Sequence, residues 1–145
     1  MKVFFDTSVL VAALIDSHPN YPRAFPWLLK AKQGEIEGFI CVHTIAELYS
    51  VLTSIPTQKK IPADEIWSLI NKSIILNFKV IELTREDYKI IINSIAENEI
   101  RGGATYDAII AHAAYKANVE KLLTFNLSHF KRVYPAISGI VQTPS

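Results

Sequence analysis

The first sixteen residues, MKVFFDTSVLVAALID, constrain the fold more than any other stretch. The apolar run from Val3 to Phe5 is too short for a helix, and its β-branched and aromatic residues favour a strand. Asp6 follows at once, and the segment 8–15 is then apolar almost without interruption. The pattern predicts a buried parallel strand that leads into a buried helix. Because open α/β sheets bind ligands at the carboxyl ends of their strands, Asp6 is expected at the functional edge.

The rest of the chain alternates short apolar segments with longer segments of helical periodicity. Strands are expected at 38–42, 79–83 and 121–124, with a fifth at 139–141 on an edge, and helices at 27–34, 43–55, 62–74, 84–95 and 105–118. This alternation is typical of a parallel sheet covered on both faces, so we predict one α/β domain over residues 1–145. Pro26 should either kink the second helix or start it.

The composition indicates where the protein works better than it indicates what the protein does. The formal net charge is +1, so any basic footprint for nucleic acid would be local. A mean hydropathy of +0.20 favours a covered surface, in a dimer or with a partner. Cys41 is the only cysteine, which fits a reducing cytoplasm. The apolar run 9–15 is too short to span a bilayer, so we expect no membrane association.

Three acids, Asp6, Glu47 and Asp107, each stand where an apolar element begins. Each has a structural alternative. Asp6 could cap the first helix, and Glu47 could complete a capping box with Thr44. Asp107 could be a first-turn acid that the helix dipole stabilises.

The three acids are expected to meet, because the strand end and the two helix starts should lie at one end of the sheet. Carboxylates brought together repel, and the pKa of at least one of them rises. A cation removes that cost. Oxygen ligands without a Cys or His cluster favour Mg²⁺ or Mn²⁺ over zinc.

Four segments carry a resemblance to a known family: FFDTSVLVAAL, HTIAELYSVLT, GGATYDAIIAHAA and LLTFNLSHF. In order and spacing they resemble the motifs of PIN-domain nucleases, especially the VapC toxins of bacterial and archaeal toxin–antitoxin pairs, over essentially the whole chain. The resemblance implies a three-layer α/β/α sandwich with a mostly parallel sheet of four to five strands. It also implies metal-dependent endoribonuclease activity on RNA, a homodimer and a small VapB-like antitoxin. The family's first three acids fall on Asp6, Glu47 and Asp107.

The chain departs from the family at the fourth acid. Asn126 and His129 stand in the segment where that acid is common. Asn126 could contact a metal-bound water. His129 could donate a proton near neutral pH, or could pack against Phe130 or Tyr134. The missing fourth acid weakens the expectation of a second fully ligated metal ion more than the expectation of the first.

The expected mechanism is metal-assisted hydrolysis. Asp6 and Asp107 would bind Mg²⁺ or Mn²⁺ directly or through water, with Glu47 completing the anionic site. The ion would orient and acidify a water and polarise the scissile phosphate, and in-line attack would leave a 5′-phosphate and a 3′-hydroxyl. Supporting hydrogen bonds are expected from Thr7, Ser8 and Thr124, although Ser8 could simply pack.

RNA also has to be held by cations. Candidates for phosphate contacts are Lys59, Lys60, Arg101, Lys131 and Arg132, each of which could instead be a solvated surface charge. Arg101 is favoured, because it adjoins Gly102 and Gly103 before the helix of Asp107. His112, in a buried helix, is expected to be structural.

Two other functions stay open. An aspartyl-phosphate enzyme also places an Asp after its first strand, but it needs further acids or a late Lys that the chain does not display, and Ser8 stands where a second acid belongs. A PIN-like module that has lost catalysis and binds RNA or protein is the stronger rival. The missing fourth acid supports that rival, and the three intact acids oppose it.

Overall fold

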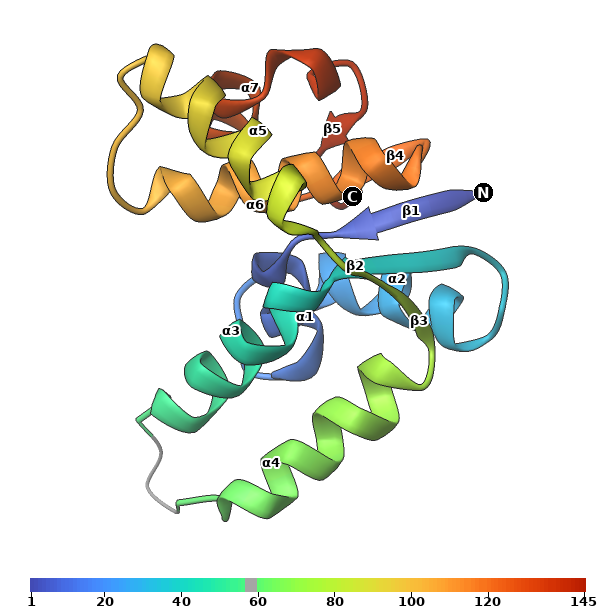
Figure 1. Ribbon diagram of the computed structural model, residues 1–145. Coiled ribbons are helices and arrows are strands. Elements are labelled where there is room, and N and C mark those ends of the chain that lie inside the picture. Colours follow the sequence, from blue (N-terminus) through green and yellow to red (C-terminus); the bar gives the residue numbers. More distant parts are fainter. Residues whose placement is uncertain (57–59) are drawn as a thin grey trace.

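The computed structural model describes residues 1–56 and 60–145 and has a five-stranded sheet at its centre (Figure 1). All four strand pairs are parallel, and the strand order is β3-β2-β1-β4-β5. The strands are β1 Lys2–Phe5, β2 Glu37–Cys41, β3 Phe78–Ile81, β4 Lys121–Leu123 and β5 Val141–Gln142. The predicted parallel sheet is confirmed, including the short fifth strand on an edge.

Helices cover both faces of the sheet and give three layers (Figure 1). One face is covered by α1 Thr7–Leu14, α2 Tyr21–Lys32, α3 Val42–Ser54 and α4 Ala63–Ile70. The other is covered by α5 Arg85–Glu97, α6 Ala104–Ala117 and α7 Leu127–Val133. A π-helical turn, Asn71–Ile75, extends α4, and a 3₁₀ turn, Pro135–Ile137, precedes β5. Among the described residues, none of the helices combines the length and apolar character that crossing a bilayer requires.

The central strands are buried on both sides. In β1, Val3 and Phe5 pack into the core of the α1–α4 layer, while Phe4 packs into the core of the α5–α7 layer. Leu122 and Leu123 of β4 divide in the same way. The period of two in a strand sends neighbouring side chains to opposite faces, so a continuous apolar run is what a doubly covered strand requires.

Two helices differ from the sequence expectation. The second helix begins at Tyr21, so the alternative in which it starts at Pro26 is wrong, and Pro26 lies inside it. An internal proline costs roughly 3 kcal/mol or more, and burial of Trp27 and Leu28 on the same helix opposes that cost. The helix Leu127–Val133 was not expected, because its seven residues, about two turns, show too little periodicity.

Candidate active site

A pocket of about 440 Å³ opens at the carboxyl edge of the sheet, between the two helical layers. We call it the acid pocket, because Asp6, Glu47 and Asp107 all line it. Asp6 directly follows β1, Glu47 lies in α3, the helix that follows β2, and Asp107 lies in the first turn of α6. The structure thus brings the three predicted acids together. The other lining residues are Thr7, Ser8, Val11, His18, Asn20, Val51, Tyr106, Ile110, Phe125 and Asn126.

Asp6 is the most buried of the three acids, with 4% of its surface exposed. Its Oδ2 accepts hydrogen bonds from the hydroxyls of Ser8, at 2.7 Å, and Thr124, at 2.8 Å. It occupies the N-cap position of α1 but makes no side-chain capping bond. Burial raises the pKa of Asp6, and the two hydroxyl hydrogen bonds oppose that rise. The supporting contacts predicted for Thr124 and Ser8 are present.

Glu47 is held by Thr7, whose Oγ1 donates to Oε1 of Glu47 at 3.0 Å. The predicted contact of Thr7 is therefore present. The capping-box alternative for Glu47 is wrong, because the box requires Thr44 as the N-cap, whereas α3 begins at Val42 and its N-cap is Cys41, three residues earlier. Burial raises the pKa of Glu47, and the negative charge of Asp6 adds to the rise.

Asp107 is the third acid whose pKa is raised. Burial, followed by the nearby charge of Asp6, raises its pKa from 3.8 to about 6. The charges of His129 and Arg132 lower the pKa of Asp107, but by less than burial and Asp6 raise it. Asp107 does lie in the first helical turn, so the helix dipole also favours its charge.

The acid pocket therefore holds negative charge that the protein does not compensate. In the described part of the chain, no Lys or Arg forms an ion pair with any of the three acids. Nor do residues 1–56 and 60–145 contain three His, Cys, Asp or Glu side chains placed to hold a metal ion together. Mg²⁺ fits such a site, because it commonly takes one or two protein carboxylates and keeps several waters. The donors suit a hard cation bound partly through water.

Asn126 lines the acid pocket and His129 lies near Asp107, in the segment where the family's fourth acid is common. Asn126 lines the pocket, and its backbone N–H donates to Oγ1 of Thr124 at 2.9 Å. His129 places Nδ1 3.7 Å from Oδ2 of Asp107, with 59% of its side chain exposed. This exposure argues against the alternative in which His129 packs against aromatic neighbours. The structure offers no carboxylate in place of the fourth acid at these two positions.

Sequence reasoning missed two rings at the pocket rim, those of His43 and Tyr106. Tyr106 lines the pocket beside Asp107, and His43 approaches Glu47, with 3.6 Å between Nε2 and Oε1. The sequence could have indicated both rings. His43 lies four residues before Glu47, a spacing that places both on one helix face, and Tyr106 directly precedes Asp107. His18 and Asn20, from the connector before α2, also line the pocket, but neither is close in sequence to one of the three acids.

None of the described candidate cations lines the acid pocket. Arg132 is the one whose charge influences Asp107. Arg101, favoured from sequence, is exposed and pairs with Glu99 at 2.8 Å. Lys60 and Lys131 are exposed, and Lys59 falls outside the described residues.

A second polar group, the Asp87 cluster, lies in the α5–α7 layer and comprises Asp87, His112, Lys116 and Tyr134. His112 contacts Asp87 through Nε2 at 3.1 Å and the Tyr134 hydroxyl through Nδ1 at 2.9 Å. Lys116 donates to Asp87 at 2.7 Å. Asp87 also completes a capping box with Thr84 at the start of α5. The expectation that His112 is structural agrees with these contacts.

Comparison with known proteins agrees with this architecture. The family model described as PIN domain matches residues 3–135. Ribonuclease VapC40 of Mycobacterium tuberculosis is 31% identical over 122 residues, which cover 84% of each chain.

Two solved structures have the same fold at lower identity. The crystal structure of VapC20 of Mycobacterium tuberculosis, described as a sarcin-ricin loop cleaving toxin, superposes with a TM-score of 0.71 at 16% identity, covering 99% of both chains. VapBC2 of Rickettsia felis, bound to a DNA fragment from its promoter, gives a TM-score of 0.67 at 20% identity, covering 100% of both chains. The chain belongs to the PIN-domain family, and within it to the VapC group.

Proposed function

We infer that this protein is an endoribonuclease, the toxin of a type II toxin–antitoxin system. The observation that carries this conclusion is the convergence of Asp6, Glu47 and Asp107 in one pocket of a PIN domain. A relative that matches over 84% of the chain is named a ribonuclease, which supports hydrolysis of RNA as the reaction.

The proposed cofactor is Mg²⁺ or Mn²⁺. Its support is the uncompensated negative charge of the acid pocket and the raised pKa of all three acids. Asp6 and Asp107 would hold the ion, directly or through water, and Glu47 would complete the anionic site. When bound, the ion supplies an activated water and a Lewis acid for the scissile phosphate.

The chain's own residues prepare this site. Ser8 and Thr124 fix the orientation of the Asp6 carboxylate, and Thr7 fixes that of Glu47. His129, whose Nδ1 lies 3.7 Å from Oδ2 of Asp107, is the proposed proton donor to a group bound beside that acid. Attack by water on phosphorus that breaks the P–O3′ bond would leave a 5′-phosphate and a 3′-hydroxyl, and it requires no Ser or Cys nucleophile.

The proposed partners are an RNA substrate, a VapB-like antitoxin and a second copy of the chain. VapBC2, which shares the fold, was solved as a complex, and this supports the antitoxin. Large apolar side chains stay exposed, among them Ile61, Leu76 and Ile90. Covering such side chains in an interface would remove them from water, and this supports the second copy.

The test is to map new RNA ends after expression and to repeat the cleavage with purified protein. We expect growth arrest, cuts with 5′-phosphate ends, activity with Mn²⁺ and none after chelation. Mn²⁺ should also raise the melting temperature, because a ligand that binds only the folded state stabilises it. Coexpression of a short reading frame beside the gene should relieve the arrest.

The rival is a PIN-like module that binds RNA or protein without cutting. It would produce no new RNA ends, would bind Mn²⁺ weakly, and its effect on cells would be unchanged by Asp6→Asn. That set of results would replace the proposed ribonuclease with the binding module.

A further inference from the structure

The rim of the acid pocket carries a pair of stacked rings. The rings of His43 and Tyr106 are parallel to within 3°, and their centroids are 5.2 Å apart. Tyr106 directly precedes Asp107 in α6, and His43 lies four residues before Glu47 in α3. The pair therefore bridges the two helical layers at the carboxyl edge of the sheet, beside two of the three acids.

Tyr106 keeps much of its ring open. It is 51% exposed even though His43 covers part of it, and it lines the acid pocket. A tyrosine that only packed α6 onto the sheet would be buried, as Ile109, Ile110 and Ala113 of the same helix are. Because Tyr106 also lines the acid pocket, part of its surface borders the space in which a substrate would lie.

A nucleobase is the group whose chemistry fits this surface. Every base has a flat π face, so stacking on an aromatic side chain tolerates different sequences and favours bases that are unpaired. Phosphates approaching the acid pocket meet carboxylates, so a contact that does not depend on charge helps to hold the nucleotide. The parallel contact with His43 fixes the plane of the Tyr106 ring.

We propose that Tyr106, backed by His43, is a stacking platform for an unpaired nucleobase next to the phosphodiester bond that is cut. This inference rests on the proposed function and adds a property of the substrate. The nucleotide beside the cut is single-stranded, and this contact does not select which base it carries.

The test uses the full chain and an RNA oligonucleotide that spans a mapped cut. Each nucleotide near the cut is replaced in turn by an abasic ribose, and kcat/KM is measured. For the wild type, one abasic position should lower kcat/KM about tenfold. Tyr106→Ala should lower kcat/KM for intact RNA by a similar factor and should be indifferent to that abasic position. Tyr106→Trp should keep the wild-type pattern.

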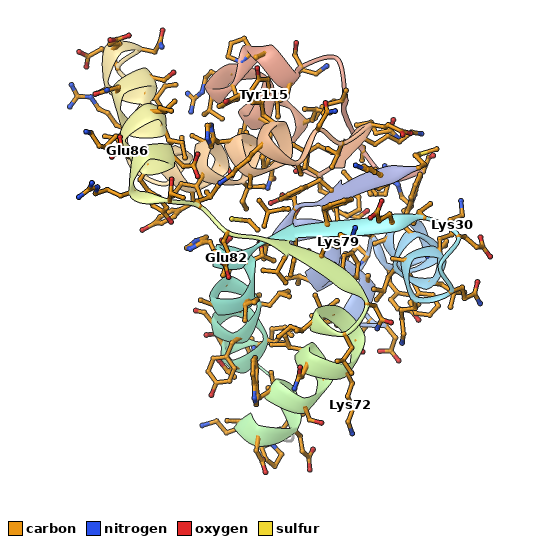
Figure 2. The ribbon with its side chains drawn as sticks, turned by 45° about the vertical axis from the view of Figure 1, so that its right-hand side comes forward. Lys30, Lys72, Lys79, Glu82, Glu86 and Tyr115 are labelled. Atoms are coloured by element: carbon orange, nitrogen blue, oxygen red, sulfur yellow. The ribbon has the colours of Figure 1, made fainter. Side chains whose placement is uncertain are left out.

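Tyr115→Ala is the matched control. Tyr115 lies on the same helix, is 58% exposed and does not line the acid pocket; Figure 2 shows it in the α5–α7 layer. This variant should behave as the wild type does. If Tyr106→Ala slows intact and abasic RNA by equal factors, Tyr106 is merely structural and the inference is overturned.

The two proposals fail in distinguishable ways. If the wild type cuts RNA in a manner that requires Asp6 but tolerates every abasic position, the stacking platform is wrong and the ribonuclease stands. If the wild type cuts no RNA under any condition, the proposed function is wrong and the platform fails with it.

Discussion

The acid pocket and the Asp87 cluster both hold carboxylates away from bulk water, yet their surroundings differ. Asp87 is 14% exposed and receives hydrogen bonds from Thr84, Lys116 and His112. Lys116 and the Thr84 backbone lower the pKa of Asp87 well below its ordinary value. In the acid pocket the pKa of each acid is instead raised by burial, and the charges of neighbouring acids raise the pKa values of Glu47 and Asp107 further.

The difference distinguishes an acid that stabilises the fold from acids whose charge is left for a ligand to neutralise. The Asp87 carboxylate is neutralised by the protein itself, so its charge contributes to folding. The carboxylates of the acid pocket stabilise the fold less, and their charge remains for a ligand to neutralise. Perturbed pKa values of this kind gather at functional sites for the same reason.

The largest effect should come from removing an acid from the pocket. Asp6→Asn or Asp107→Asn should lower RNA cleavage by more than about a hundredfold, because a ligand of the catalytic ion is lost. Far-UV circular dichroism should show an intact fold, and Asp87→Asn should retain cleavage. Cleavage that persists in both pocket variants would refute the assignment of these acids.

The pH dependence of stability should have opposite signs in the two regions. The pKa of Asp107 is about 6 in the folded state against 3.8 for an ordinary Asp, so the folded state binds more protons between these values. The free energy of unfolding should therefore fall as pH rises from about 4 to 6, by at most about 3 kcal/mol. Urea denaturation of Asp107→Asn should show a smaller fall than the wild type, since the raised pKa values of Asp6 and Glu47 remain, and the variant should gain stability at pH 7. An identical pH slope in this variant would contradict the coupling.

Asp87→Asn should instead lose stability at pH 7. The substitution removes the charge from hydrogen bonds to Lys116 and His112, each typically contributing about 1.5–3 kcal/mol when charged. The folded pKa of Asp87 is depressed, so its contribution is present above the unfolded pKa and is lost as pH falls through the folded value. Urea midpoints at pH 7 and pH 3 measure this loss, which should shrink at the lower pH. A urea midpoint equal to that of the wild type at pH 7 would show that Asp87 does not stabilise the fold, and would contradict the difference between the two regions.

The smallest effect should come from Arg132→Gln. Its charge favours the ionised form of Asp107, so the pKa of Asp107 should rise further in the variant. RNA binding should weaken, and the slope of log affinity against log salt should fall by about one if Arg132 contacts a phosphate. Arg85→Gln, which removes an exposed arginine paired with Glu86, is the control and should leave the slope unchanged.

Local pattern determined the outline of this molecule. The apolar run of β1, the helical periodicities and the positions of Asp6, Glu47 and Asp107 relative to them are properties of neighbouring residues. They predicted the parallel sheet and its functional edge. The wrong expectations, the start of α2 at Pro26 and the capping box of Glu47, were also local. The first fails because Ala24, ahead of Pro26, is buried in the core, and the second fails because α3 already begins at Val42.

Only the tertiary structure decided which side chains meet. The hydrogen bond from Thr124 to Asp6 joins residues 118 apart in the sequence, and the His43–Tyr106 stack joins helices from opposite layers. No local periodicity encodes such contacts, because they depend on strand order and on which layer each helix joins. The sequence thus determined which acids stand at the edge of the sheet, whereas packing determined their hydrogen-bond partners, their pKa values and the aromatic rim beside them.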